Sequence, residues 1–373
     1  MYNNKLAKSG SYLEEKMYKS VTMFFYSGTG NTYRVANWIG EYALTKGINP
    51  ELVPMNKDHR NIIDESGDDN IIGLLFPTHA FTAPLGAIKF ALTMPPGKGR
   101  HCFVLATRGG GGITAGTPGC EGSGTWLIAA ILKSKGYVVK GVCAVDMPSN
   151  WNVVHSSYSS KKIERILANA HDKSWELAEG IFKGDKVYKG IIPAIIGILF
   201  LPLSVLYLLI GRQYLSKIFF TNNKCNGCGL CAKNCPNKAI KMIGNKKARP
   251  YWSFSCESCM RCMAFCPHKA IEASHLVLIL MLAVFYIPFS KRVWIYIEYA
   301  FSSVWISAFA GFVLAAAACI VMLYLLHIIT NIISRWKIPN MILCITTFTR
   351  FFKRYTEPGT EVPDMVKATS QKL

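Results

Sequence analysis

Eight of the thirteen cysteines lie in one short stretch of the chain at regular spacing. They form two runs of the pattern C-x2-C-x2-C-x3-C-P, namely Cys225, Cys228, Cys231 and Cys235, then Cys256, Cys259, Cys262 and Cys266. Disulfide bonds would be expected in a small secreted chain, but this chain is large and its first twenty residues show no apolar signal core. Metal ligation is therefore favoured over disulfide bonds. Thiolates suit both zinc and iron. Because both runs are complete and end in Cys-Pro, iron–sulfur clusters are favoured over two structural zinc sites.

This cysteine pattern resembles that of the bacterial two-cluster ferredoxins, in which the fourth cysteine of each run serves the other cluster. The resemblance implies one 4Fe-4S cluster on Cys225, Cys228, Cys231 and Cys266, and a second on Cys256, Cys259, Cys262 and Cys235. Every iron then has a cysteine ligand, so the clusters would pass single electrons. Residues 221–272 carry nine Lys and Arg against two Glu, which suits an acidic redox partner or anionic lipid headgroups.

A second candidate site follows an apolar run at residues 21–26. Its residues are Ser27, Gly28, Thr29, Gly30, Asn31 and Thr32. Backbone N–H groups and hydroxyls at a helix N-terminus can cradle a phosphate. No Gly-Lys-Ser/Thr follows, and Tyr33 stands where a dinucleotide fingerprint needs glycine, so no NAD(P)H site is recognised. The hexamer resembles the flavodoxin phosphate loop, which implies FMN, and an ordinary strand-to-helix turn is the alternative.

Two later loops would enclose the flavin ring if the resemblance holds, because such folds bind ligands where the strand order reverses. The first spans residues 77–84 and the second residues 107–114. The implied contacts are Thr78, His79 and Phe81, then Thr107, Arg108, Gly109 and Gly110. Arg108 would complement negative charge on the flavin. The alternative for His79 and Phe81 is ordinary loop packing, and neither loop has a Tyr or Trp at the usual ring-stacking place.

The elements that must position these residues follow from hydrophobic periodicity. Short apolar runs alternate with helix-like stretches from residue 21 to about 185, which is typical of a parallel sheet covered by helices. Five strands are expected, at residues 21–26, 51–55, 71–76, 102–106 and 137–145. Val35, Ile39 and Tyr42 share one helical face, and a second helix is expected around Ile163 to Ala170. The predicted fold class is an α/β flavodoxin-like doubly wound parallel sheet, an α+β two-cluster ferredoxin domain and C-terminal membrane helices.

The order of these parts resembles the flavodoxin–ferredoxin fusion proteins of anaerobic bacteria and archaea, over residues 21 to about 273. Five segments are predicted. They are an FMN-binding domain (1–187), an apolar membrane-associated linker (188–220), a ferredoxin domain (221–273), membrane helices (274–333) and a basic cytoplasmic tail (334–373).

Composition also predicts a membrane protein. The formal net charge is +20, yet 51% of the residues are hydrophobic, which is uncommon in nucleic-acid binders and suits a chain with cations on the cytoplasmic side. Residues 302–326 are uncharged and long enough to span, whereas residues 275–289 are short for a span. The basic residues that follow residue 333 should lie in the cytoplasm, which favours an even number of membrane crossings after the cluster domain. The expected location is the cell membrane, with both cofactor domains on its cytoplasmic side.

Residues 191–210 are also long enough to cross a membrane. A single crossing there would place the flavin domain and the cluster domain on opposite sides, separating partners that should exchange electrons. Pro193, Gly197 and Pro202 favour a broken, interfacial segment instead, and a buried linker helix is the alternative.

The predicted function is electron relay between a bound FMN and two 4Fe-4S clusters, and on to a redox partner at the membrane, either a protein or a quinone. One alternative is a flavin-dependent oxidoreductase similar to quinone reductases and fed by its own ferredoxin domain. Another is a membrane-tethered iron–sulfur redox sensor. An ion-pumping subunit would need paired charges within the span, and residues 302–326 contain none. The sequence leaves open whether the chain is an enzyme or a carrier.

Overall fold

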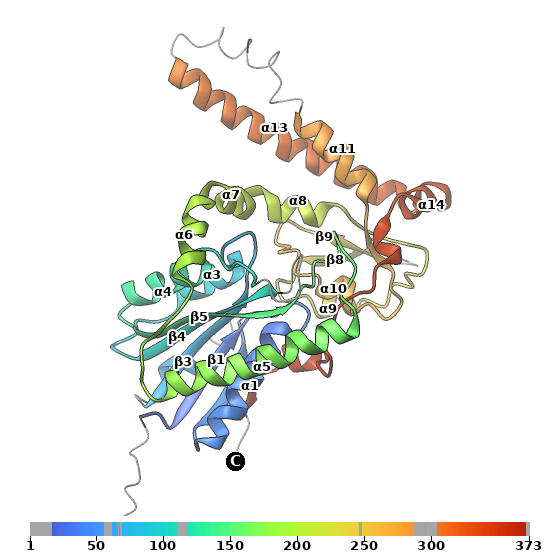
Figure 1. Cartoon of the computed structure of the whole chain (residues 1–373). Helices are drawn as coiled ribbons and strands as arrows, with labels where there is room; N and C mark the ends of the chain where they lie inside the picture. The colour runs from blue at the N-terminus through green and yellow to red at the C-terminus, as the bar shows by residue number, and fades with distance from the viewer. Residues whose placement is uncertain are drawn as a thin grey trace, which may run out of the picture.

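The computed structural model describes residues 17–370, except 56–61, 66, 68, 111–117, 246–247, 287–294 and 296–303. A sheet domain forms the N-terminal half, and a smaller domain with the cysteine runs lies beside it (Figure 1). Helices α11 (His275–Tyr286) and α13 (Val304–Ile333) project away from both domains (Figure 1).

The sheet has the doubly wound order of flavodoxin-like folds. Its strands are β1 (Ser20–Phe25), β2 (Asn49–Pro54), β3 (Asn70–Pro77), β4 (His101–Gly110), β5 (Val138–Pro148), β6 (Val187–Tyr188) and β11 (Thr369–Ser370). They lie in the order β11-β2-β1-β3-β4-β5-β6, parallel except for β11. The inner order 2-1-3-4-5 places the switch point between β1 and β3, where cofactor loops are expected. The predicted fold class and the five predicted strands are confirmed, whereas the two-residue strands β6 and β11 were not predicted.

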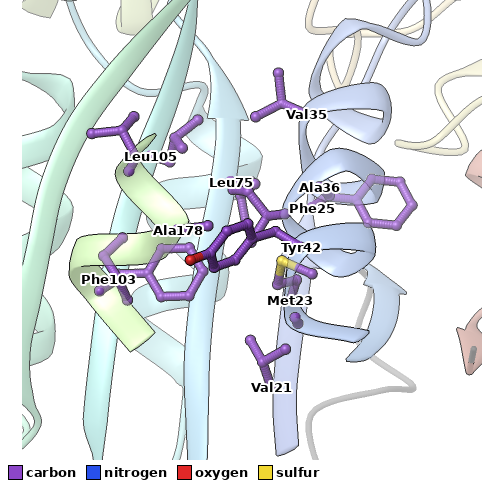
Figure 2. Packing of buried hydrophobic residues seen from close by; sticks show 14 of the residues in the cluster. Val21, Met23, Phe25, Val35, Ala36, Tyr42, Leu75, Phe103, Leu105 and Ala178 are labelled. Carbon is purple, nitrogen blue, oxygen red and sulfur yellow. The ribbon is translucent and has the colours of Figure 1, made fainter. Parts of the chain in front are cut away.

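Helices cover both faces of this sheet. Helices α1 (Asn31–Thr45) and α5 (Ser160–Phe182) lie on one face, and α3 (Leu85–Thr93) and α4 (Gly124–Ser134) on the other, while α2 (Ile62–Glu65) is short. Successive residues of a strand point to opposite faces. Figure 2 shows the consequence, with Val21, Met23 and Phe25 of β1 packed beside Val35 and Tyr42 of α1. The helical face predicted from Val35, Ile39 and Tyr42 is therefore confirmed.

The smaller domain repeats one unit of strand and helix. Strand β7 (Phe219–Thr221) pairs with β10 (Ile271–Ala273), and β8 (Ile240–Ile243) pairs with β9 (Arg249–Trp252), all antiparallel. Two four-residue helices, α9 (Leu230–Lys233) and α10 (Arg261–Ala264), each contain the third cysteine of a run, Cys231 and Cys262 respectively. The domain's core includes the fully buried rings of Phe219, Phe220 and Trp252. This is the predicted α+β arrangement.

Residues 191–217, here called the apolar insert, join the two domains as a bent helical segment. They form α6 (Ile191–Leu199), α7 (Leu201–Leu206), a π-helical turn (Tyr207–Gly211) and α8 (Arg212–Lys217). The axis bends by 72° between Ile191–Leu199 and Leu201–Lys217, and Pro202 lies in the first turn of α7. The bend therefore occurs at one of the predicted breaks.

One helix within the described ranges, Ile306–Ile333, is long and apolar enough to cross a membrane, with a mean hydropathy of 2.6. The apolar insert would count as a second candidate only if its bent halves formed one span. Helix α11 packs against α13, and the base of α13 reaches α8, where the His327 ring lies 3.0 Å from the Lys217 carbonyl oxygen. The ends of both predicted apolar segments, at 287–289 and 302–303, fall outside the described residues.

The C-terminal region from residue 334 differs from the predicted tail. It contains α14 (Lys337–Ile345) and 3-10 turns at Phe348–Phe351 and Pro363–Met365, and it ends in β11. Asn340 is buried and donates hydrogen bonds to the carbonyls of Thr221 and Ser334, at 2.8 and 2.7 Å. The basic composition of this region gave no sign of such packing, because the Thr221 carbonyl that accepts one of these hydrogen bonds lies in a distant part of the sequence.

Candidate cofactor sites

The structure brings the eight cysteines together in the two sets that the ferredoxin resemblance implies. Electrostatic interactions connect the Cys231 thiol with Cys225, Cys228 and Cys266. A second group of interactions connects Cys262 with Cys256, Cys259 and Cys235. Below, these are called the first and the second cysteine set. Each set therefore takes three cysteines from one run and the fourth from the other.

The backbone that carries the cysteines repeats at an offset of 31 residues. Positive φ angles recur at three equivalent pairs, which are Gly227 with Ser258, Gly229 with Met260, and Lys238 with Lys269. The first run uses glycine at two of these positions, whereas the second run holds Ser258 and Met260 at φ values of 50° and 64°. Non-glycine residues adopt this region at an energetic cost, so the surrounding structure must enforce it. A common requirement to wrap the loop around a cluster explains this repetition.

The cysteine sulfurs accept equivalent backbone hydrogen bonds in the two halves. Ala239 N–H donates to the sulfur of Cys235 and Ala270 N–H to that of Cys266, both at 3.3 Å. Such bonds favour the more negative state of a cluster and help to set its potential. Burial raises the pKa of Cys256 to about 12, so the thiolate at this position depends on positive charge from bound iron. The chemistry of both donor sets fits 4Fe-4S clusters.

The second cysteine set lies directly against the loop that follows β1. A Cβ atom added to Gly28 would lie 2.1 Å from the carbonyl oxygen of Cys259, so only glycine fits there. Arg261 is buried, and its guanidinium donates to the carbonyls of Ser27 and Gly28 on one side and of Asn234 on the other. A residue of the cluster domain thus ties the two domains together at the candidate phosphate loop.

Tyr26 makes a second connection at the same place. Its hydroxyl accepts a 3.0 Å hydrogen bond from the Asn237 side-chain amide and lies near enough to the Cys259 thiol for the two groups to interact electrostatically. Burial raises the pKa of Tyr26 well above its ordinary value, so the hydroxyl keeps its proton. The last residue before the candidate phosphate loop is therefore hydrogen-bonded to the cluster domain, next to a cysteine of the second set.

The loop itself retains the features of an anion cradle. Its backbone N–H groups from Ser27 to Thr32 donate no hydrogen bond to the residues that the structure describes. The Ser27 hydroxyl is buried and has no partner there either. Gly30, at φ 107°, caps the N-terminus of α1, which directs the helix dipole toward the loop. These orphaned donors fit the phosphate end of FMN.

Other groups of the loop are already engaged. Thr29 Oγ1 accepts a hydrogen bond from Asn150 (2.9 Å), and the hydroxyls of Thr32 and Thr107 lie 2.8 Å apart. Asn31 donates to the Pro148 carbonyl and accepts from the Tyr355 hydroxyl, both at 2.8 Å. These contacts hold the loop in place and leave its backbone amides and Ser27 for a ligand.

The C-terminal chain closes over this loop. Glu357 N–H donates to the Thr29 carbonyl, and the Glu357 carboxylate pairs with Arg34 at 2.8 Å. Burial raises the pKa of Glu357, against the opposing effects of Arg34 and Thr360. The cluster domain and the C-terminal chain therefore both contact the loop.

The structure places His79 and Phe81 beside the apolar insert, and Thr78 next to β4, where its N–H donates to the Thr107 carbonyl. The Phe81 ring stacks on Phe200 with ring centroids 5.0 Å apart, and His79 faces Tyr207 edge-on. The Thr78 hydroxyl is buried without a partner among the described residues. The aromatic neighbours favour the packing alternative for His79 and Phe81, whereas the orphaned Thr78 hydroxyl remains a candidate ligand group.

The second expected ring loop differs from the prediction. Residues Thr107 to Gly110 belong to β4 and pair with Val145 to Pro148 of β5, because β5 is longer than expected. Arg108 forms ion pairs with Asp146 (2.9 Å) and the buried Glu121, so its charge is already neutralised. These ion pairs leave Arg108 less available as a counter-charge for flavin, and that role stays a prediction. Residues 111–114 of this loop lie outside the described residues.

Sequence reasoning missed several residues that shape the site, above all Tyr26, Arg261, Tyr355 and Glu357. Arg261 stands inside a cysteine run, but the spacing carried no sign that its side chain would turn toward another domain. Tyr355 and Glu357 lie more than 300 residues from the loop they contact.

Comparisons with known proteins agree with an iron–sulfur domain in this part of the chain. Residues 217–267 match the family of 4Fe-4S dicluster domains. The sheet domain is similar to solved flavodoxins. One from the domain Archaea has 16% identity and a TM-score of 0.30 over 43% of this chain and 98% of its own. A flavodoxin from Streptococcus pneumoniae TIGR4 has 15% identity and a TM-score of 0.28, over 43% of this chain and 99% of its own. The flavodiiron protein of Giardia intestinalis has 18% identity and a TM-score of 0.28, over 45% of this chain and 38% of its own. No curated protein sequence matches the chain.

Proposed function

We propose that the chain is a membrane-associated electron-transfer protein that holds FMN at the loop after β1 and two 4Fe-4S clusters on the two cysteine sets. Bound FMN exchanges electrons singly or in pairs, and the clusters exchange them singly. The observation that carries the proposal is the contact between Gly28 and Cys259, reinforced by Arg261. It joins the orphaned amides of the phosphate loop to a ligand of the second cysteine set.

The two cysteine sets have different surroundings, which supports an order for the relay. The second set touches the phosphate loop, and its Cys256 is buried. The first set includes Cys228, the exposed member of the eight. We assign the second set to exchange with the flavin and the first set to exchange with an external partner.

Three features support a location at the membrane surface. Helix α13 meets the length and composition of a span. Because the two domains contact each other, the apolar insert between them begins and ends on the same side. Its α6 exposes Ile192, Ile195 and Ile198 on one side, as a helix lying in the interface would. The excess of Lys and Arg supports a position of both domains on the cytoplasmic side.

A redox partner at the membrane, either a protein or a quinone, completes this proposal. The basic surface around the first cysteine set suits an acidic protein, and the nearby membrane suits a quinone. Electron transfer that proceeds equally well without lipid and without membrane partners would count against either one.

Cofactor content tests the proposal first. The full chain is purified anaerobically in detergent, and iron, sulfide and released flavin are measured per chain. Eight irons, eight sulfides and one FMN are expected, since each set of four cysteines holds one cluster. Eight irons without flavin would contradict the flavin assignment and leave a membrane-bound ferredoxin, and zinc in place of iron would contradict the relay itself.

A further inference from the structure

A cavity of about 590 Å³ lies between the cluster domain and the C-terminal region, apart from the cofactor sites. Its walls come from the chain on either side of the cysteine runs, near Asn222 and Lys269, and from α14 and the turn that follows it. Six of the side chains that line it are basic, namely Lys224, Lys269, Lys337, Arg350, Lys353 and Arg354.

The charge of this cavity is not balanced from within. Glu272 is its one acidic lining residue among those described, and it is already bound by Arg354 and by the hydroxyl of Thr349. Arg354 is used as well, because it donates to the carbonyls of Met263 and Ile271. The five remaining cations form no ion pair with the described residues. The cavity is therefore suited to an anion.

One side of the cavity is apolar and continues onto an exposed surface. Met341 and Phe351 line the cavity and are largely exposed. On α14 and the following turn, further apolar side chains are exposed, namely Ile338, Ile342, Ile345 and Phe348. An anion bound here would lie beside apolar side chains, which suits an amphipathic ligand better than an inorganic ion.

The position of the cavity relative to the candidate membrane span also favours an amphipathic ligand. Helix α13 ends at Ile333 and α14 begins at Lys337, so the cavity lies within a few residues of the end of the span. Figure 1 shows α14 at the base of α13, beside the cluster domain. Lipid phosphates lie at this level of a bilayer, and anionic headgroups attract clustered Lys and Arg.

We propose that this cavity binds the phosphate-bearing headgroup of an anionic lipid, with the acyl chains lying along the apolar side of α14. The inference rests on the membrane association proposed above and adds a defined lipid site to it. An acidic protein could use the cations, but it would leave Met341, Phe351 and the apolar side of α14 uncovered. The lipid would fix the cluster domain at a constant height and orientation on the membrane.

The test compares lipid binding by the full chain and by two matched double variants. Lys337→Gln with Arg350→Gln removes two unpaired cations of the cavity. Lys46→Gln with Lys133→Gln removes two exposed cations from the sheet domain and is the control. Each protein is mixed with vesicles of phosphatidylcholine alone or with phosphatidylglycerol added, and flotation measures binding. Native mass spectrometry counts the lipids that remain bound, and the iron content verifies folding.

The unchanged chain and the control should prefer phosphatidylglycerol vesicles and retain the anionic lipid. The cavity variant should lose roughly thirtyfold in affinity for those vesicles, since each cation near the surface contributes about 1 kcal/mol, and should keep its binding to neutral vesicles. Inorganic phosphate should not displace the lipid. Displacement by phosphate at similar concentration would overturn the lipid source in favour of free phosphate.

Equal lipid binding by the cavity variant and the control would also overturn the proposal and would leave the cations to an acidic protein partner. A chain that binds neither kind of vesicle refutes the membrane association itself. A chain that binds both kinds equally refutes only the headgroup site, so the two proposals fail in distinguishable ways.

Discussion

Tyr26 and Gly28 sit two residues apart and join the sheet domain to one cysteine set by different means. Tyr26 accepts a hydrogen bond from Asn237 beside Cys259, whereas Gly28 leaves room for the Cys259 carbonyl. The sequence could identify Gly28 as part of a phosphate loop because that loop has a recognisable pattern. It could not identify Tyr26, because a buried aromatic residue at the end of a strand usually indicates only packing.

Tyr26→Phe should lower the reduction potential of the cluster on the second cysteine set. A polar hydroxyl beside the Cys259 sulfur stabilises the reduced cluster, and losing about 0.5–1.5 kcal/mol of that interaction corresponds to roughly 20–60 mV for one electron. A potentiometric titration followed by electron paramagnetic resonance measures the shift. The other cluster should be unchanged, and an equal shift of both would count against this local account.

Gly28→Ala should separate the two domains at the phosphate loop. The added methyl would collide with backbone rather than with a flexible side chain, since Cys259 O would lie 2.1 Å away. We expect loss of flavin and a thermal unfolding midpoint lowered by several degrees. Gly86→Ala on α3 is the matched control, because its nearest neighbour atom would lie 3.6 Å away. If both variants retain flavin equally, the close contact does not matter.

Helices and strands could be predicted from the sequence where they are long enough to show a periodic pattern of apolar residues. The five inner strands and the helix around Ile39 had clear apolar patterns, and the structure contains them. Strand β11 has two residues and pairs with β2 only because the C-terminal chain returns to the sheet. The packing of α6 could not be predicted either, because it depends on a contact between distant segments. A Cβ atom on Gly197 would lie 2.0 Å from the Ser123 nitrogen.

The exposed side of α6 should contribute to membrane binding. Ile192, Ile195 and Ile198 are 71, 62 and 65% exposed, so replacing all three with Ser removes little internal packing. Each isoleucine buried in lipid contributes up to about 1.5–3 kcal/mol, so vesicle binding should fall at least tenfold. Vesicle flotation measures it. The control carries Leu92→Ser, Leu127→Ser and Val154→Ser, three exposed positions of the sheet domain, and should bind normally. Equal binding by both variants would contradict the interfacial placement of α6.

At the scale of the whole molecule, the C-terminal chain binds both domains together. Arg354 donates to carbonyls of the cluster domain, Tyr355 contacts Asn31, and Glu357 pairs with Arg34 on α1. The cysteine runs and the phosphate loop could each be recognised from short patterns. Their apposition could not, because it depends on Arg261 and on a chain segment whose composition resembles a solvated tail.

The central claim is that electrons pass between flavin and clusters within one molecule. The most direct test is flash photoreduction of the flavin in the anaerobic, detergent-purified chain, with cluster bleaching followed in time. Because the phosphate loop and the second cysteine set are in contact, the account predicts cluster reduction at a rate independent of protein concentration. Cluster reduction that scales with protein concentration, or no cluster reduction after the flash, would contradict it.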